Sequence, residues 1–260
     1  MSTALPELSL VRQALAGAID RGELRAYFQP QVDLQTGRIV AAEALCRWQH
    51  PEWGFVSPEI FIPLAEDDDV ILEIGRWMID ESCRWSATWL EHGLVVDIAV
   101  NVSAAQLSTA AFLTYVESAI ESSGARPRTI TLEITESRHI ADASITSSLL
   151  APLRALGVGV SIDDFGTGYS SVQQLVTLPA TELKVDQSLV RRESELTHTL
   201  LSTVVELAHS RELRTVAEGV ETTEQLTLVR ELGFDRAQGF LIGKALPPAE
   251  FELQLAGQVD

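Results

Sequence analysis

Two adjacent aspartates, Asp163 and Asp164, are the clearest candidates for chemistry in this sequence. They follow the apolar, strand-like run from Val158 to Ile162 and precede a glycine-rich stretch that runs to Ser171. Two neighbouring carboxylates repel each other, so burying both without a cation would raise a pKa or cost stability. A hard divalent metal ion removes that cost. The pattern therefore predicts a metal site, with an exposed acidic turn as the alternative, because aspartate is a common turn former.

Other acidic and amide side chains stand at the ends of further predicted strands. Asn101 ends the alternating run that follows Gly93, and Glu133 and Glu136 close the run that begins at Thr129. Amide and carboxylate oxygens are ligands that hard metal ions accept. An ordinary turn residue is the alternative for Asn101.

Glu43 and Lys184 are charged residues within apolar, strand-like runs. A carboxylate is expensive to bury alone, so Glu43 needs either a cation such as Arg47 or a metal ion, and its spacing leaves both open. Lys184 can form a salt bridge to the acids or can orient a water molecule. Glu218 ends the strand-like run that begins at Arg214.

Strands and helices alternate along most of the chain, which has 260 residues, 46% of them hydrophobic. This length and pattern predict one α/β domain of about eight strands, for which a barrel is the common architecture. An amphipathic helix from Leu8 to Ile19 is expected as a lead-in. The runs Ala26 to Leu34 and Arg38 to Cys46 are separated by a gap of hairpin size, which predicts an antiparallel first strand pair.

The charge balance excludes several classes of partner. The chain has 19 basic and 37 acidic residues and a formal net charge of -18, which disfavours binding to DNA, RNA or anionic membrane surfaces. No apolar run approaches the roughly 18 residues of a membrane helix, and no signal peptide is recognisable, so we expect a cytoplasmic protein without membrane insertion. Cys46 and Cys83 predict reduced thiols rather than a disulfide or a zinc site.

Seven short motifs occur in a fixed order along the chain. They are EALCRW with Glu43, NVS with Asn101, LEITES with Glu133 and Glu136, DDFGTGYSS with Asp163 and Asp164, LKVD with Lys184, VAEGVET with Glu218 and QGFLIGKALP with Gln238. Together they closely resemble the EAL domain of bacterial cyclic di-GMP phosphodiesterases, over about Arg25 to Leu253. Cys46, where the family more often has leucine, is an apolar exchange that leaves Glu43 and Arg47 in place.

The resemblance implies a fold, a domain division and a reaction. The fold is a modified TIM (β/α)8 barrel with an antiparallel first strand, occupying residues 23–257 after a helical lead-in of residues 1–22. The reaction is metal-dependent hydrolysis of cyclic di-GMP to linear 5'-pGpG, which lowers the level of this bacterial second messenger.

The resemblance also assigns roles to individual residues. Metal ligation falls to Glu43, Asn101, Glu133, Asp163, Asp164 and Glu218. The catalytic residues would be Glu43, Asp164, Lys184 and Glu218, with Lys184 holding the nucleophilic water. Substrate would be bound by Gln29, Leu45, Arg47, Asp186 and Gln238. Glu136 would brace the loop that follows Asp164.

The implied cofactors are two Mg²⁺ or Mn²⁺ ions, with Ca²⁺ expected to inhibit. The implied partners are cyclic di-GMP, a second copy of the chain in a homodimer, and a sensor or GGDEF domain in a longer protein. A catalytically inactive EAL domain that serves as a cyclic di-GMP receptor or docking module is the main alternative, although every expected metal-site acid is present. An unrelated acid-rich barrel that stabilises an enolate on a metal is another alternative, but the sequence identifies no substrate base for it.

Overall fold

The computed structural model describes residues 7–107, 110–135, 143–166, 175, 177–192 and 194–258. Eight strands form a closed barrel in the order β1-β9-β8-β7-β6-β5-β4-β2, because β1 also pairs with β2, and the short β3 extends β2. The strands are β1 Leu24–Asp33, β2 Ile39–His50, β3 Gly54–Val56, β4 Asp97–Val102, β5 Ile130–Thr135, β6 Gly159–Phe165, β7 Glu182–Val185, β8 Arg214–Ala217 and β9 Arg236–Gln238.

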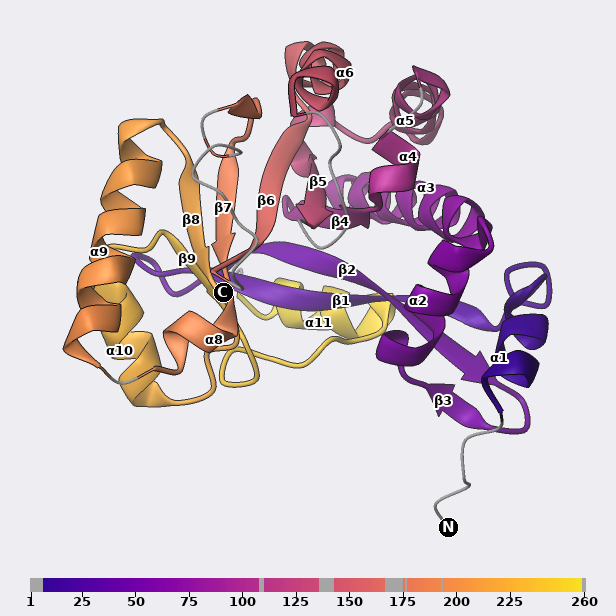
Figure 1. Ribbon diagram of the computed structural model, residues 1–260, viewed down its shortest axis with the longest axis horizontal. Coiled ribbons are helices and arrows are strands. Elements are labelled where there is room, and N and C mark those ends of the chain that lie inside the picture. The colour runs from indigo at the N-terminus through magenta and orange to yellow at the C-terminus, as the bar shows by residue number, and fades with distance from the viewer. Residues whose placement is uncertain are drawn as a thin grey trace.

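The first strand is antiparallel to both of its neighbours, β2 and β9, whereas β2 and β4 to β9 are parallel to one another in succession. This confirms the predicted hairpin and the modified TIM barrel. The two strands are longer than predicted, since β1 already begins at Leu24 and β2 continues to His50. Figure 1 shows this hairpin reaching out of the barrel towards β3 and α1.

Helices surround the barrel (Figure 1). They are α1 Leu8–Leu15, α2 Pro58–Asp67, α3 Val70–Glu91, α4 Ala104–Leu107, α5 Ala110–Ser123, α6 Ala143–Leu156, α8 Gln187–Val190, α9 Glu195–Ser210, α10 Thr223–Glu231 and α11 Pro248–Ala256, with a 3-10 turn η1 at Pro127–Thr129. No helix among the described residues combines the length and apolarity needed to cross a membrane.

Helix α1 ends at Leu15, earlier than the predicted Ile19. Its apolar face, with Val11 and Leu15, is buried in the hydrophobic core. Arg12 adds ion pairs to Asp67 at 3.0 Å and to Asp68 at 2.7 Å, at the end of α2. The helix is therefore fixed to the barrel through α2.

Alternation along the parallel strands separates apolar from polar side chains. Ile98, Ile130, Leu132, Val160 and Leu183 have almost no exposed surface and belong to the hydrophobic core. The residues between them on these strands include polar and charged ones, which meet inside the barrel. Buried charges are stable only when they are paired or bind metal ions, so the barrel interior needs its own electrostatic balance.

Four charged residues supply that balance at the beginning of the strands. Asp97, Glu182, Arg214 and Arg236 are the first residues of β4, β7, β8 and β9. Arg214 contacts Glu182 at 2.9 Å and Arg236 contacts Asp97 at 2.8 Å, with longer contacts across the two pairs. These ion pairs close the amino-terminal end of the barrel. The carboxyl ends of the strands, where barrel enzymes carry their chemistry, lie at the other end.

Candidate active site

Lys184, fully buried on β7, lies at the centre of the carboxyl end of the barrel. Its ammonium nitrogen Nζ is surrounded by carboxylate oxygens of four residues. The distances are 2.8 Å to Glu218, 3.0 Å to Glu133, 3.2 Å to Asp163 and 3.5 Å to Glu43. One cation thus faces four acids, and this acid cluster carries an excess of negative charge when its members are ionised.

The strand register explains why residues far apart in sequence meet here. Asn101 on β4 is the direct neighbour of Glu133 on β5, and two residues further along β5 the backbone of Thr135 pairs with that of Asp163 on β6. Glu218 follows the last residue of β8, and its backbone N–H donates to Val185 at 3.0 Å. Parallel strands therefore present their final side chains at one end of the barrel, as predicted from their positions in the sequence.

Glu43 is held by a set of amide donors. Asn101 donates through Nδ2 to Glu43 Oε1 at 2.9 Å, and Gln238 donates through Nε2 to Glu43 Oε2 at 2.7 Å. Gln31 in turn donates to the Oε1 of Gln238 at 2.9 Å. With its Nδ2 used in this way, Asn101 keeps its Oδ1 available as a ligand atom.

The local environment lowers the pKa of one acid of the cluster and raises the pKa of others. Burial opposes ionisation of Glu43, but Lys184 and the donors from Gln238 and Asn101 outweigh it and lower the Glu43 pKa. Burial also raises the pKa of Glu133 and of Glu218 well above the usual value, and the neighbouring acids add to this effect. The four carboxylates raise the pKa of Lys184 well above its ordinary value against the opposing effect of burial, so Lys184 stays charged.

Asp163 and Asp164 lie at an irregularity of β6. The β6–β7 register shifts between Ile162 and Phe165, and Asp164 has a left-handed backbone with φ of 59°. The Asp164 N–H donates to the Asp163 carboxylate at 2.9 Å. Burial, together with Asp163 and Asp186, raises the pKa of Asp164 to about 6. The strand continues through both aspartates to Phe165, slightly past the predicted end.

The Asp164→Asn variant tests this pKa. Because the Asp164 pKa is raised from 3.8 to about 6, the folded state holds this proton more tightly than the unfolded state does, and the group's contribution to stability falls as pH rises between these values. The variant removes this unfavourable charge, so it should increase the free energy of unfolding of the metal-free protein at pH 7.5. We expect an increase of roughly 1 kcal/mol, because solvent screens a partly exposed group, and little effect at pH 4.5. Asparagine tolerates the left-handed backbone, so geometry is preserved. Urea unfolding after chelation measures both values, and an equal effect at the two pH values would contradict the raised pKa.

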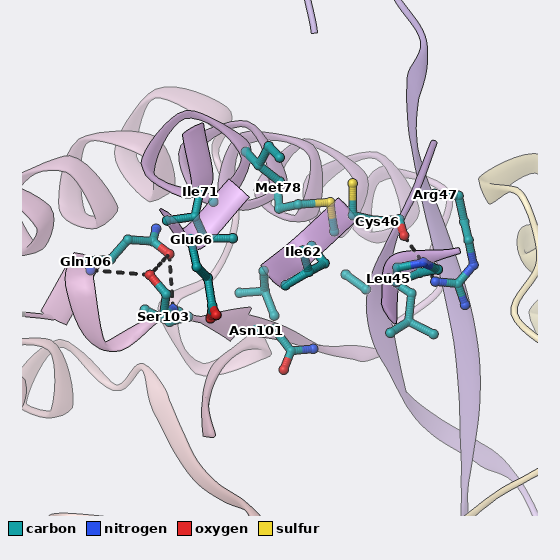
Figure 2. A pocket seen from close by; sticks show the side chains of 16 residues that line it. Leu45, Cys46, Arg47, Ile62, Glu66, Ile71, Met78, Asn101, Ser103 and Gln106 are labelled. Carbon is teal, nitrogen blue, oxygen red and sulfur yellow. Dashed lines mark hydrogen bonds between the residues drawn. The ribbon is translucent and has the colours of Figure 1, made fainter. Parts of the chain in front are cut away.

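Two hollows adjoin the acid cluster. A cleft of about 320 Å³ is lined by the acids Glu43, Asp163, Asp164 and Glu218 and by neighbouring loop residues. A mostly apolar cavity of about 270 Å³ lies between β2, β4, α2 and α3. In Figure 2, Leu45 and Arg47 border one side of this cavity and Ser103 and Gln106 the other, with Asn101 at its edge. Glu43 and Asn101 thus connect the cleft to the cavity through their hydrogen bond.

The remaining predicted site residues line these two hollows, except for Glu136, which lies outside the described residues. Gln29, Asp186 and Gln238 line the cleft, and Leu45 and Arg47 line the cavity. Gln29 donates to the Gly243 carbonyl at 3.2 Å, and Asp186 caps α8 by accepting from the Ser188 N–H at 2.8 Å. Glu136 and the glycine-rich stretch from 167 to 171 lie outside the described residues.

Sequence reasoning missed Gln31, which is fully buried and positions Gln238. A signal was present, since Gln31 repeats the polar type of Gln29 two residues earlier, and both alternate with the buried residues Phe28 and Pro30 of the same strand. Two such side chains lie on one face of a strand, and here both of them serve the site.

The acid cluster fits divalent metal ions. Asp163, Asp164 and Glu218 offer carboxylate oxygens that all lie within 4.8 Å of one another. Glu133 has no exposed surface, and within the described part of the chain its Oε2 has no hydrogen-bond partner. A buried carboxylate oxygen without a donor is costly, and a cation would compensate for it. The donor set is entirely oxygen, which suits Mg²⁺ or Mn²⁺ rather than softer metals.

Comparisons with known proteins point to one family. The family model described as EAL domain matches residues 12–245. The bifunctional diguanylate cyclase/cyclic di-GMP phosphodiesterase MucR of Pseudomonas aeruginosa is 40% identical over 261 residues, covering 98% of this chain and 38% of MucR. The oxygen sensor protein DosP of Escherichia coli is 37% identical over 253 residues, covering 96% of this chain and 32% of DosP. The chain therefore spans less than half the length of either relative.

A solved structure shows the same similarity in three dimensions. The MucR phosphodiesterase in its c-di-GMP complex superposes with a TM-score of 0.88 and 39% sequence identity, covering 93% of this chain and 99% of that one. The barrel and its closure are therefore shared with a protein of the same sequence family.

Proposed function

The chain belongs to the EAL domain family, and from this premise we propose that it is a metal-dependent phosphodiesterase that hydrolyses cyclic di-GMP to linear 5'-pGpG. The observation that carries the proposal is the acid cluster, in which four carboxylates lie within 3.5 Å of the Lys184 ammonium at the carboxyl end of the barrel. An inactive receptor would not need this surplus of buried acids. The family's use of divalent metal ions accounts for it.

The acid cluster and the polar residues beside it have separate roles in this proposal. Divalent ions would be held by Glu43, Asn101, Glu133, Asp163, Asp164 and Glu218. When bound, a pair of such ions lowers the pKa of a water molecule and neutralises charge that develops on the phosphate. Lys184 would orient the attacking water, and its own charge is secured by the acids around it. Gln238 and Gln31 would keep the Glu43 carboxylate oriented towards the ions.

The two hollows provide room for a dinucleotide on both sides of the acid cluster. Substrate would be bound by Gln29, Asp186 and Gln238 in the cleft and by Leu45 and Arg47 in the cavity. Burial lowers the pKa of Arg47, and Glu43 opposes this effect. The Arg47 Nη1 donates to the Cys46 carbonyl at 3.1 Å, so the guanidinium keeps further donors for a phosphate.

Incubating the purified protein with cyclic di-GMP and Mg²⁺ or Mn²⁺, and resolving the products by chromatography, tests the proposal. We expect linear 5'-pGpG to form, and we expect Ca²⁺ to inhibit. A calorimetric titration of cyclic di-GMP in Ca²⁺ runs in parallel. Tight binding without product under every metal condition would instead establish the receptor function, and the absence of both would reject the substrate.

The family membership supports four further parts of the proposal. We place the EAL domain at residues 23–257 and treat residues 1–22 as a helical lead-in. We expect a cytoplasmic location and a homodimer, which light scattering would reveal as twice the mass of 28.4 kDa. MucR and DosP are longer proteins of which this chain covers a part, which supports control by an attached sensor or GGDEF domain.

A further inference from the structure

The lining of the cleft is strongly one-sided in charge. Among its described lining residues, the acids are Glu43, Asp163, Asp164, Asp186, Glu218 and Glu221, and the cation is Arg191. Metal ions at the acid cluster would neutralise the inner acids, whereas Asp186 and Glu221 are outside that set. A cyclic dinucleotide carries two negatively charged phosphodiesters, so its entry is opposed by this outer charge unless a cation offsets it. Arg191 is placed to do so.

Arg191 forms an ion pair within the lining of the cleft. Its backbone N–H donates to the Gln187 carbonyl at 2.9 Å, immediately after α8. Its Nη2 lies 2.5 Å from Glu221 Oε1, and the two side chains are 44% and 38% exposed. The Glu221 N–H donates to Gln225 Oε1 at 2.7 Å, which ties that residue to the start of α10. Both partners therefore stand on fixed backbone, while their side chains face solvent.

An exposed ion pair of this kind is easily exchanged. Such pairs contribute little to stability because water screens both charges. Arg191 contacts Glu221 through Nη2, whereas a guanidinium can bind a phosphate through two parallel charge-assisted hydrogen bonds. A phosphate could therefore replace Glu221 as the partner of Arg191 with a gain in binding. The released Glu221 carboxylate would be hydrated by solvent, so its release would cost little free energy.

We infer that Arg191 binds a phosphate group of the cyclic dinucleotide after releasing Glu221, and that Glu221 competes with the substrate for this arginine. The inference rests on the proposed function. It predicts effects of opposite sign for the two partners. Arg191→Gln removes the phosphate contact and should raise both the dissociation constant and KM for cyclic di-GMP about tenfold, with kcat changed less than about threefold. Glu221→Gln frees the arginine and should lower both constants by about two- to fivefold.

A purely structural ion pair would behave differently, because either substitution breaks it equally. The experiment titrates cyclic di-GMP into the full chain in Ca²⁺ by calorimetry and measures KM with Mg²⁺ for wild type, Arg191→Gln and Glu221→Gln. Arg192→Gln is the matched control, since Arg192 is the next residue, is also exposed and is not part of the cleft lining. It should bind cyclic di-GMP as wild type does.

The outcomes distinguish the role of Arg191 from the phosphodiesterase activity itself. Opposite shifts for Arg191→Gln and Glu221→Gln, with Arg192→Gln unchanged, support the inference. Shifts in the same direction, or an equal loss in Arg192→Gln, overturn it while leaving the phosphodiesterase intact. A wild-type protein that neither binds nor cleaves cyclic di-GMP overturns the proposed function, and the role of Arg191 falls with it.

Discussion

Replacing Glu43 with glutamine is expected to reduce cyclic di-GMP hydrolysis by on the order of a thousandfold, because a metal-ligating carboxylate contributes several kcal/mol of charge stabilisation and each 1.4 kcal/mol is a factor of ten. The substitution keeps the size of the side chain. It nevertheless removes a charge and introduces an NH₂ group where Asn101 and Gln238 already donate, at 2.9 Å and 2.7 Å. One donor must then face another donor. We expect weaker Mn²⁺ binding as well as lower kcat, measured by calorimetry and product formation.

Glu182→Gln provides a matched control for this variant. Glu182 is also buried inside the barrel, at 2% exposure, but it pairs with Arg214 at the amino-terminal end. Its replacement should lower thermal stability and leave kcat close to wild type at temperatures where the variant is folded. If Glu182→Gln lost activity to the same degree as Glu43→Gln, the loss would reflect a general cost of altering buried acids rather than the acid cluster.

The sequence predicts the barrel and most of the acid cluster for a simple physical reason. Alternation along Asp97–Val102 and Ile130–Thr135 determines which side chains face the interior, and parallel strands bring their final residues to one end. Asn101 and Glu133 are therefore neighbours in the structure, as their equivalent positions on successive strands suggest. The antiparallel first hairpin follows from the short gap between two strand-like runs.

Other features depend on geometry that no local pattern contains. Lys184 could pair with one acid or with several, and only barrel closure places four carboxylates around it. The left-handed backbone at Asp164 coincides with the register shift between β6 and β7. The ion pair between Arg236 and Asp97 joins residues separated by 139 positions. Each of these arrangements is set by contacts across the barrel rather than by neighbours in sequence.

Lys184→Met is expected to destabilise the metal-free protein by about 3 to 5 kcal/mol at pH 8, because it leaves several buried carboxylates without their cation. Methionine matches the length and apolar stem of lysine, so packing is largely retained. Protonation of the acids reduces the repulsion between them, and Glu133, Asp163 and Glu218 already have raised pKa values. In the variant the folded state binds more protons than the unfolded state, so its stability falls as pH rises above about 4.

The difference in unfolding free energy between wild type and Lys184→Met should therefore grow between pH 5 and pH 8, and urea unfolding at several pH values measures it. Saturating Mn²⁺ should reduce the difference, since a bound cation replaces the missing charge. Lys244→Met is the control, because Lys244 is the only other lysine in the sequence and is exposed at the surface. A pH-independent loss that Mn²⁺ does not reduce would mean that Lys184 acts through packing, and the charge balance of the acid cluster would then need another explanation.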